Sequence, residues 1–509
     1  MNSIPLLLAS AVCSLCTPSF ADGRDYGEGL LNLTPSVVLE NTDGSRDHWQ
    51  GIGRLTTGSG NCTATLLDTR DELEQPGTPA YVLTAGHCIE LTNGNIVTDR
   101  PVTGSLTFNY FTDSTAFKTY PLKTTTWRSI QGVDMAIVEL DVSLQELIDN
   151  GVQPLTLARE TPADGTDVLI VGAPKGFDQT TLRMSACDLQ PAREIVEGAW
   201  VWRNTFMTRC QDIRGGGSGS PLLDRSSNEI VGVIGTGNFD EGLVPCREHA
   251  PCTPAGEAYQ AIPGNVYGNP TAFLNGCFLE GRIAKNPPSS CQLFPAFTID
   301  TDAITLESYQ RVKHQDDGSI AIPTWNYRFS ISTDFYRHKT VRKAMECESP
   351  HHYSDVEGSE NAFINSEIGS EPGHYFLCIL GLDSATQKPE SGLLKNALSL
   401  PVEILDNKPT TPPDLSIVTE VFVTLAKAEE PHRTYSIKYG PAATTDCSQP
   451  DKYRNNVEMD FFVPSEKLPG KLCSIAYDKS GQASAPRVDL LGYATDTHEA
   501  ATPTAEVAN

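Results

Sequence analysis

The apolar and polar residues of the N-terminal half fall into short runs separated by turn residues. Ser105–Phe111 alternates polar and apolar residues, which is the period of a half-buried β-strand. Other short, largely apolar runs predict strands at 51–55, 63–67, 81–85, 135–140, 168–172 and 230–234. The one clear helical pattern in this part covers Leu144–Ile148. Strands at this spacing predict an antiparallel barrel or sandwich.

The pattern changes near residue 285, where Asn286–Ser290 has the composition of a linker. Two later segments, 327–378 and 435–473, resemble each other weakly: each holds a strand pattern, a cysteine, and a Pro-Gly pair followed by a second cysteine. We therefore predict a linker at 286–300 and two small β-sandwich, immunoglobulin-like modules at 301–408 and 409–492. Each module would hold one internal disulfide, Cys347–Cys378 and Cys447–Cys473. The Ala/Thr-rich tail at 493–509 predicts disorder.

The first residues have the pattern of a secretory signal. They are apolar and uncharged up to Asp22, and the small residues Ser19 and Ala21 stand at the cleavage-determining positions. We expect cleavage after Ala21 and secretion to an extracellular or periplasmic space. Residues 22–45 would then form an N-terminal arm or a propeptide. No later stretch is apolar for long enough to predict a membrane span.

Charge and cysteine content narrow the class of protein. The net charge of −26 would repel nucleic acid and anionic membranes, so neither is expected as a partner. Removal of Cys13 and Cys16 with the signal leaves an even number of the 14 cysteines, which favours disulfides in an exported chain. No remaining cysteine or histidine spacing is typical of zinc, so no metal or cofactor is expected.

Three positions carry candidate chemistry. Ser218 stands in a glycine-dense loop, His87 directly follows a predicted strand, and Asp134 directly precedes one. Each residue alone is typical of a structural role: Ser218 of a surface turn, His87 of a structural histidine, and Asp134 of a cap or turn. Together they supply the nucleophile, the general base and the carboxylate that hydrolysis through a serine requires.

The surrounding residues resemble a known family. Thr84–Cys88, Asp134–Val138 and Gly216–Pro221 are similar to the three signature blocks of the chymotrypsin/trypsin-like serine proteases, in the same order, over about residues 46 to 280. The resemblance implies that His87 is the general base, that Asp134 orients it, and that Ser218 is the nucleophile. The N–H groups of Gly216 and Ser218 would form the oxyanion hole. It also implies an all-β domain at 46–285, in which two six-stranded antiparallel barrels hold the site between them.

The resemblance extends to disulfides, with one clear departure. It implies Cys62–Cys88 and Cys187–Cys210, and the domain's remaining cysteines are then left as Cys246–Cys252 and Cys277–Cys291. Gly217 stands where animal trypsins have the aspartate that binds a new N-terminal amine, so we do not expect that activation route. In this respect the chain resembles bacterial secreted members, such as the staphylococcal glutamyl endopeptidases.

The resemblance also suggests a substrate preference, through one acidic residue near Ser218. Asp212 lies six residues before Ser218, where the resemblance implies an acid at the floor of a pocket for Lys or Arg. Gly235, Thr236 and Gly237 would form the edge of that pocket. A structural role for Asp212 stays open, as does a glutamyl or apolar preference. Ile234 stands where glutamyl enzymes have a histidine, and Asp240 and Glu241 are the other candidate acids.

We therefore predict a secreted serine endopeptidase that acts on protein or peptide substrates, with cleavage after Lys or Arg as one option. The two C-terminal modules would bind a surface or matrix ligand, stabilise the enzyme, or contact the protease domain. One alternative is a non-catalytic, protease-like binding scaffold. Another is a serine esterase of the α/β-hydrolase type, although that fold carries its triad in the order Ser, Asp, His.

Overall fold

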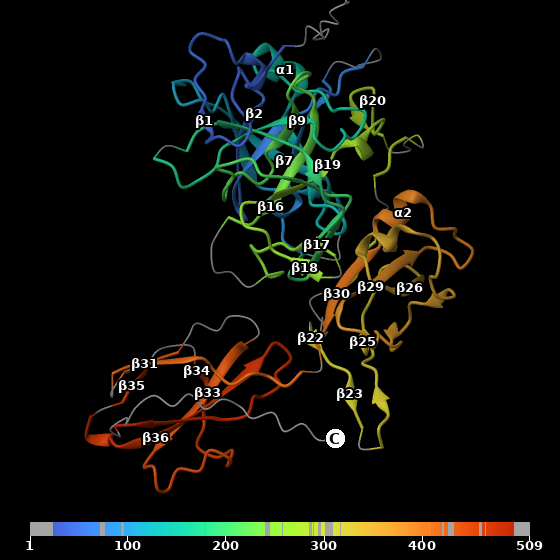
Figure 1. Cartoon of the computed structure of the whole chain (residues 1–509). Helices are drawn as coiled ribbons and strands as arrows, with labels where there is room; N and C mark the ends of the chain where they lie inside the picture. Colours follow the sequence, from blue (N-terminus) through green and yellow to red (C-terminus); the bar gives the residue numbers. More distant parts are fainter. Residues whose placement is uncertain are drawn as a thin grey trace, which may run out of the picture.

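The computed structural model describes residues 24–492, except 72–76, 93–95, 179, 240–244, 257, 285–287, 289, 294–296, 301–308, 316, 407, 420–421, 426–431, 458–460 and 464. The predicted signal, the predicted tail, Asp240 and Glu241 lie outside these residues. Strands dominate the described part, as the sequence predicts (Figure 1). Its two α-helices are α1 (Leu144–Asp149), which the sequence predicted, and α2 (Ser391–Lys395).

The first half of the N-terminal domain is a closed barrel of six antiparallel strands, which confirms one predicted barrel. The order is β7-β6-β2-β3-β4-β8, and pairing of β7 with β8 closes the ring. Their bounds are β2 (Ile52–Thr57), β3 (Gly60–Leu66), β4 (Pro79–Thr84), β6 (Gly104–Phe108), β7 (Lys118–Ser129) and β8 (Met135–Ser143), and β5 (Val97–Pro101) is added beside β7. Apolar side chains such as Leu55, Phe108 and Ile137 fill the interior.

The second half is an open sheet, whereas the family resemblance implied a second six-stranded barrel; a half-barrel is consistent with the trypsin-like fold. Its order is β1-β10-β9-β15-β16-β19-β14-β11. The bounds are β1 (Val37–Val38), β9 (Asp167–Gly172), β10 (Arg183–Asp188), β11 (Gln190–Pro191), β14 (Phe206–Thr208), β15 (Pro221–Asp224), β16 (Ile230–Gly237) and β19 (Val266–Pro270). The two edge strands, β1 and β11, are only two residues long and do not pair with each other, so the described strands form a half-barrel.

The N-terminal arm is part of this sheet. Its strand β1 pairs with β10, and Leu39 is fully buried in the same core as the barrel. Asp25 forms an ion pair with Arg225 at 2.7 Å, and this bond holds the pKa of Asp25 down at about 2, against the opposing effect of burial. The segment predicted as an arm or a propeptide therefore lies in the structure as an integral edge of the domain.

Two modules follow the N-terminal domain. Module 1 has a five-stranded sheet of β22 (Tyr309–Gln310), β30 (Leu398–Ile404), β29 (Gly373–Leu382), β26 (Phe335–Val341) and β27 (Glu357–Gly358), in that order, and a second sheet of β25 (Tyr327–Arg328) and β28 (Phe363–Ile364). Phe297 and Ile299 lie in its core, so it begins before residue 301. Module 2 pairs β31 (Leu415–Thr419), β32 (Phe422–Leu425) and β35 (Phe461–Phe462) in one sheet, and β34 (Arg454–Val457), β33 (His432–Gly440), β36 (Gly470–Asp478) and β37 (Arg487–Leu491) in another.

The two modules share a local design that the weak sequence repeat reflects. In module 1, the Lys339 ammonium lies 4.2 Å from the ring centre of Tyr353, whose hydroxyl donates to the Cys347 carbonyl. In module 2, Lys438 lies 5.2 Å from the ring centre of Tyr453, whose hydroxyl donates to the Cys447 carbonyl. Each lysine stands opposite the second cysteine of its module's disulfide. The predicted repeat is therefore also a structural one.

The remaining short strands pair as hairpins. They are β12 (Glu194–Glu197) with β13 (Trp200–Arg203), β17 (Thr253–Ala255) with β18 (Ala258–Gln260), β20 (Phe278–Leu279) with β21 (Arg282–Ile283), and β23 (Lys313–His314) with β24 (Ile320–Ala321). Strand β13 of the first of these hairpins contacts β30 of module 1. Because side chains alternate across a strand, this hairpin presents two different faces.

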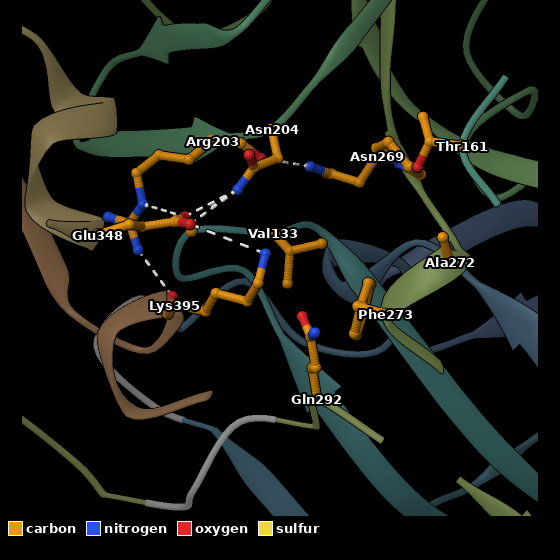
Figure 2. A pocket seen from close by; sticks show the side chains of 12 residues that line it. Val133, Thr161, Arg203, Asn204, Asn269, Ala272, Phe273, Gln292, Glu348 and Lys395 are labelled. Atoms are coloured by element: carbon orange, nitrogen blue, oxygen red, sulfur yellow. Dashed lines mark hydrogen bonds and ion pairs between the residues drawn. The ribbon is translucent and has the colours of Figure 1, made fainter. Parts of the chain in front are cut away.

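One face of the β12–β13 hairpin is buried against module 1. Val196 and Val201 pack there on Ala344 and Phe376. The fully buried Arg203 forms an ion pair with Glu348 at 3.1 Å and donates to three further oxygen acceptors (Figure 2). These acceptors are the carbonyls of Lys395 and Ala397 and the hydroxyl of Ser399. Module 1 is thus docked on the N-terminal domain through a buried, charged contact.

Candidate active site

A cleft of about 560 Å³ opens between the barrel and the half-barrel. Its lining includes His87 from the barrel and Ser218, Gly235, Thr236 and Gly237 from the half-barrel. The other face of the β12–β13 hairpin contributes Glu197, Trp200 and Trp202 to the same cleft. The structure therefore brings the predicted base, nucleophile and pocket edge to one place.

His87 is held directly by Asp134. It lies in a short 3₁₀ turn, Gly86–Cys88, that follows β4, while Asp134 directly precedes β8, the partner of β4. One carboxylate oxygen of Asp134 accepts from the imidazole Nδ1–H at 2.7 Å, and the other accepts from the His87 backbone N–H at 2.9 Å. This double contact fixes the ring and its tautomer, and leaves Nε2 as the nitrogen that can take up a proton.

Asp134 is completely buried and is positioned in turn from the half-barrel. Its backbone N–H donates to the Asn269 side-chain oxygen at 3.0 Å, and the Asn269 amide donates to the Arg203 carbonyl at 3.2 Å. Burial lowers the pKa of His87, but the Asp134 carboxylate and, further away, Glu197 raise it, and the net result is a raised pKa. A protonated imidazole is therefore stabilised in this site, as proton transfer from a serine requires.

Ser218 lies in a loop whose backbone is tightly constrained. Its hydroxyl donates to the Gly235 carbonyl at 3.3 Å, and its own carbonyl accepts from the Thr63 N–H at 2.8 Å. Gly219 has a φ of +81°, and a side chain there would collide with Thr63 and Thr84. Only glycine fits at that position, which explains part of the glycine density around the serine.

The loop leaves two backbone donors free beside the serine. The N–H groups of Gly217, Gly219 and Ser220 donate to carbonyls within 3.0 Å. By contrast, the N–H groups of Gly216 and Ser218 have no acceptor among the residues that the structure describes. Gly216, at φ +92°, occupies a backbone conformation that side-chain-bearing residues rarely adopt. Free adjacent N–H groups of this kind can stabilise an oxyanion.

The structure does not place Asp212 in the cleft. Its carboxylate accepts from the backbone N–H and the hydroxyl of Ser36, at 2.8 and 2.9 Å, and so binds the N-terminal arm. The pocket-floor prediction is thus corrected: Asp212 binds the arm, which the resemblance did not cover, and is not among the residues that line the cleft. Arg214 lines the cleft, and its guanidinium lies 5.1 Å from the ring centre of Phe177.

Sequence reasoning missed the part of the cleft wall that the β12–β13 hairpin forms. Glu197, Trp200 and Trp202 come from a hairpin that was not predicted, and Glu197 stands directly opposite Trp200 in its register. The sequence does contain a pattern that predicts this hairpin. The runs 194–197 and 200–203 are rich in strand-forming residues and are separated by Gly198-Ala199, which is a hairpin pattern.

Six disulfides cross-link the described residues. They are Cys62–Cys88, Cys187–Cys210, Cys246–Cys252, Cys277–Cys291, Cys347–Cys378 and Cys447–Cys473, the same pairs that the sequence analysis proposes. Such a set is typical of an extracellular protein. Cys62, His87 and Cys88 lie close enough together to suggest a metal site, but both sulfurs are already bonded to each other. In the described part of the chain, no helix is long and apolar enough to cross a membrane.

A family model for the trypsin-like peptidase domain matches residues 62–233, the segment that contains all three candidate catalytic residues. The chain contains a trypsin-like peptidase domain. A search of curated proteins found no match.

The peptidase domain is also similar to solved structures. A Glu endopeptidase in complex with MPD shares 19% identity over 48% of this chain and 94% of that chain, with a TM-score of 0.31. The protease Anisep from Arthrobacter nicotinovorans shares 15% over 46% and 95%, with a TM-score of 0.30. Human heparin binding protein shares 13% over 50% and 99%, with a TM-score of 0.32.

Proposed function

We propose that this protein is a secreted serine endopeptidase that cleaves peptide bonds through His87, Asp134 and Ser218. The observation that carries the proposal is that Ser218 and His87 line one cleft, where Asp134 holds the imidazole of His87. The N–H groups of Gly216 and Ser218, which have no acceptor among the described residues, support it. A peptidase domain implies protein substrates, and the six disulfides fit a secreted enzyme.

The proposed mechanism gives each group a defined role in two similar steps, formation and hydrolysis of an acyl-enzyme. Rotation about the Ser218 side-chain bond turns its hydroxyl from the Gly235 carbonyl toward His87, and Oγ attacks the scissile carbonyl carbon while Nε2 takes the proton. The N–H groups of Gly216 and Ser218 bind the oxyanion of the tetrahedral intermediate. The imidazolium then protonates the leaving amine, and a water molecule hydrolyses the acyl-enzyme by the same route. Asp134 keeps the ring oriented and stabilises its charged form throughout.

The test compares the purified full chain with Ser218→Ala, using a peptide library and a phosphonate probe that labels activated serines. We expect labelling and hydrolysis in the unmodified chain, and a loss of about 10⁶-fold in kcat in the variant. Absence of both in the unmodified chain would favour the non-catalytic scaffold instead. Hydrolysis that survives Ser218→Ala would refute the assigned nucleophile.

The substrate preference is part of the same proposal. Preference for Lys or Arg was predicted from Asp212, which in the structure binds Ser36. A cation preference therefore requires another acid in the cleft. Binding of a surface or matrix ligand by the modules stays a prediction, and docking on the peptidase domain is the role that the contacts of module 1 support.

A further inference from the structure

We propose that Glu197 binds a lysine or arginine side chain of the substrate, within a few residues of the scissile bond. The proposal rests on the proposed peptidase function and names the substrate class of that same cleft. Glu197 lies on the β12–β13 hairpin, in the wall of the cleft that holds His87 and Ser218.

Glu197 is a buried carboxylate with an unused acceptor. The residue is 4% exposed, and one carboxylate oxygen accepts from the His249 backbone N–H at 2.8 Å. The other oxygen has no partner within hydrogen-bond distance in the described part of the chain, although the Thr236 hydroxyl lies near enough to lower the pKa of the carboxyl group. A buried carboxylate is costly unless it is paired. Among the described residues Glu197 forms no ion pair with a lysine or arginine, and His87 is the cation that acts on its pKa. A substrate cation would supply the missing partner.

Aromatic side chains beside Glu197 can contact the methylene groups of a substrate lysine or arginine. Trp200 and Trp202 stand beside it on the same face of the hairpin, and Phe239 lines the cleft too. Apolar ring faces can pack on the methylene stem of lysine or arginine and attract its charged end. Glu197 and Trp200 are cross-strand partners in the hairpin, so their side chains are neighbours on the face that lines the cleft.

The other charged groups of the cleft do not cancel this preference. Glu248, at the exposed rim, adds a second carboxylate beside His249. The one arginine in the lining, Arg214, is exposed and lies over the Phe177 ring. Burial raises the pKa of Glu197, and the His249 N–H and the nearby Thr236 hydroxyl lower it only in part. A bound cation would favour the charged carboxylate.

The decisive variant is Glu197→Gln. Glutamine has nearly the same shape and keeps an oxygen for the His249 N–H, so it removes the charge and leaves that structural bond. Asp212→Asn is the matched control, since it removes a carboxylate near the catalytic loop that does not line the cleft. Each full-length protein is profiled with a peptide library that varies one position at a time, and its active fraction is counted by phosphonate labelling.

We expect the unmodified enzyme and Asp212→Asn to prefer Lys or Arg at one library position. In Glu197→Gln, that preference over neutral residues should fall roughly 10- to 100-fold, measured on the active fraction that the labelling counts. An unchanged cation preference in Glu197→Gln overturns the inference, as does a labelled, active enzyme with no cation preference at any position. An unmodified chain that is neither labelled nor active overturns the proposed function as well, so the two failures are distinguishable.

Discussion

The docking of module 1 makes a measurable prediction about catalysis, because the hairpin it supports also forms the cleft wall. Val196, Val201 and Arg203 face module 1, whereas Glu197 and Trp200 face the cleft. Arg203 also contacts the loop that precedes the candidate catalytic residue Asp134: its backbone N–H donates to the Gly132 carbonyl at 2.8 Å. Loss of docking should therefore disturb both the cleft wall and the Asp134 loop.

Glu348→Ala is the perturbation that tests this coupling. The change removes the carboxylate that pairs with Arg203, which is 0% exposed at its side chain and would stay buried with an uncompensated charge. The Asn204 side chain, now bonded to Glu348 at 2.9 and 3.0 Å, would lose its partner as well. Removal of one partner from a buried ion pair costs about 3–5 kcal/mol. Glu348→Gln, which keeps oxygen and amide groups there, should cost less.

The assay combines calorimetry of thermal unfolding with kcat/KM on the best library peptide. We expect Glu348→Ala to lower the unfolding temperature clearly and kcat/KM by up to about 100-fold, because a displacement of about 1 Å in a catalytic group has that effect. The control is Glu139→Ala, which breaks the exposed Lys123 pair of the barrel and should cost less than about 1 kcal/mol. If Glu348→Ala behaves like this control in both measurements, the proposed support of the active site by module 1 is wrong.

Three further predictions follow from the site and the arm. Asp134→Asn should lower kcat about 10⁴-fold. It should also move the acid limb of the pH–kcat/KM profile to lower pH, because the carboxylate raises the pKa of His87 and only neutral imidazole accepts the serine proton. An acid limb that stays in place would contradict this. Asp212→Ala should cost about 1–3 kcal/mol of stability by removing the acceptor of Ser36, with substrate preference unchanged. Deletion of residues 24–45 should prevent stable folding, because it removes buried Leu39 and an edge strand; an active, equally stable truncated enzyme would show the arm to be dispensable.

The sequence by itself determined the features that short contiguous segments encode. The runs around His87, Asp134 and Ser218 carry both the candidate chemistry and the strand or turn that holds each residue. The resemblance of these runs to a known family implied the barrels, one of which is closed in the structure. The glycines beside Ser218 are local in the same sense, since backbone conformation and crowding at Gly219 demand them. The weak repeat in the C-terminal half likewise predicted two β modules, each with its own disulfide.

Only the tertiary structure decided the roles that depend on which distant segment lies against a side chain. Asp212 bonds to Ser36, 176 residues away in sequence, and Arg203 pairs with Glu348, 145 residues away. The burial of a charge, and hence its energy and its function, depends on these neighbours, and no local pattern specifies them. For the same reason the open second sheet, the docking of module 1 and the position of Glu197 in the cleft became visible only in the folded chain.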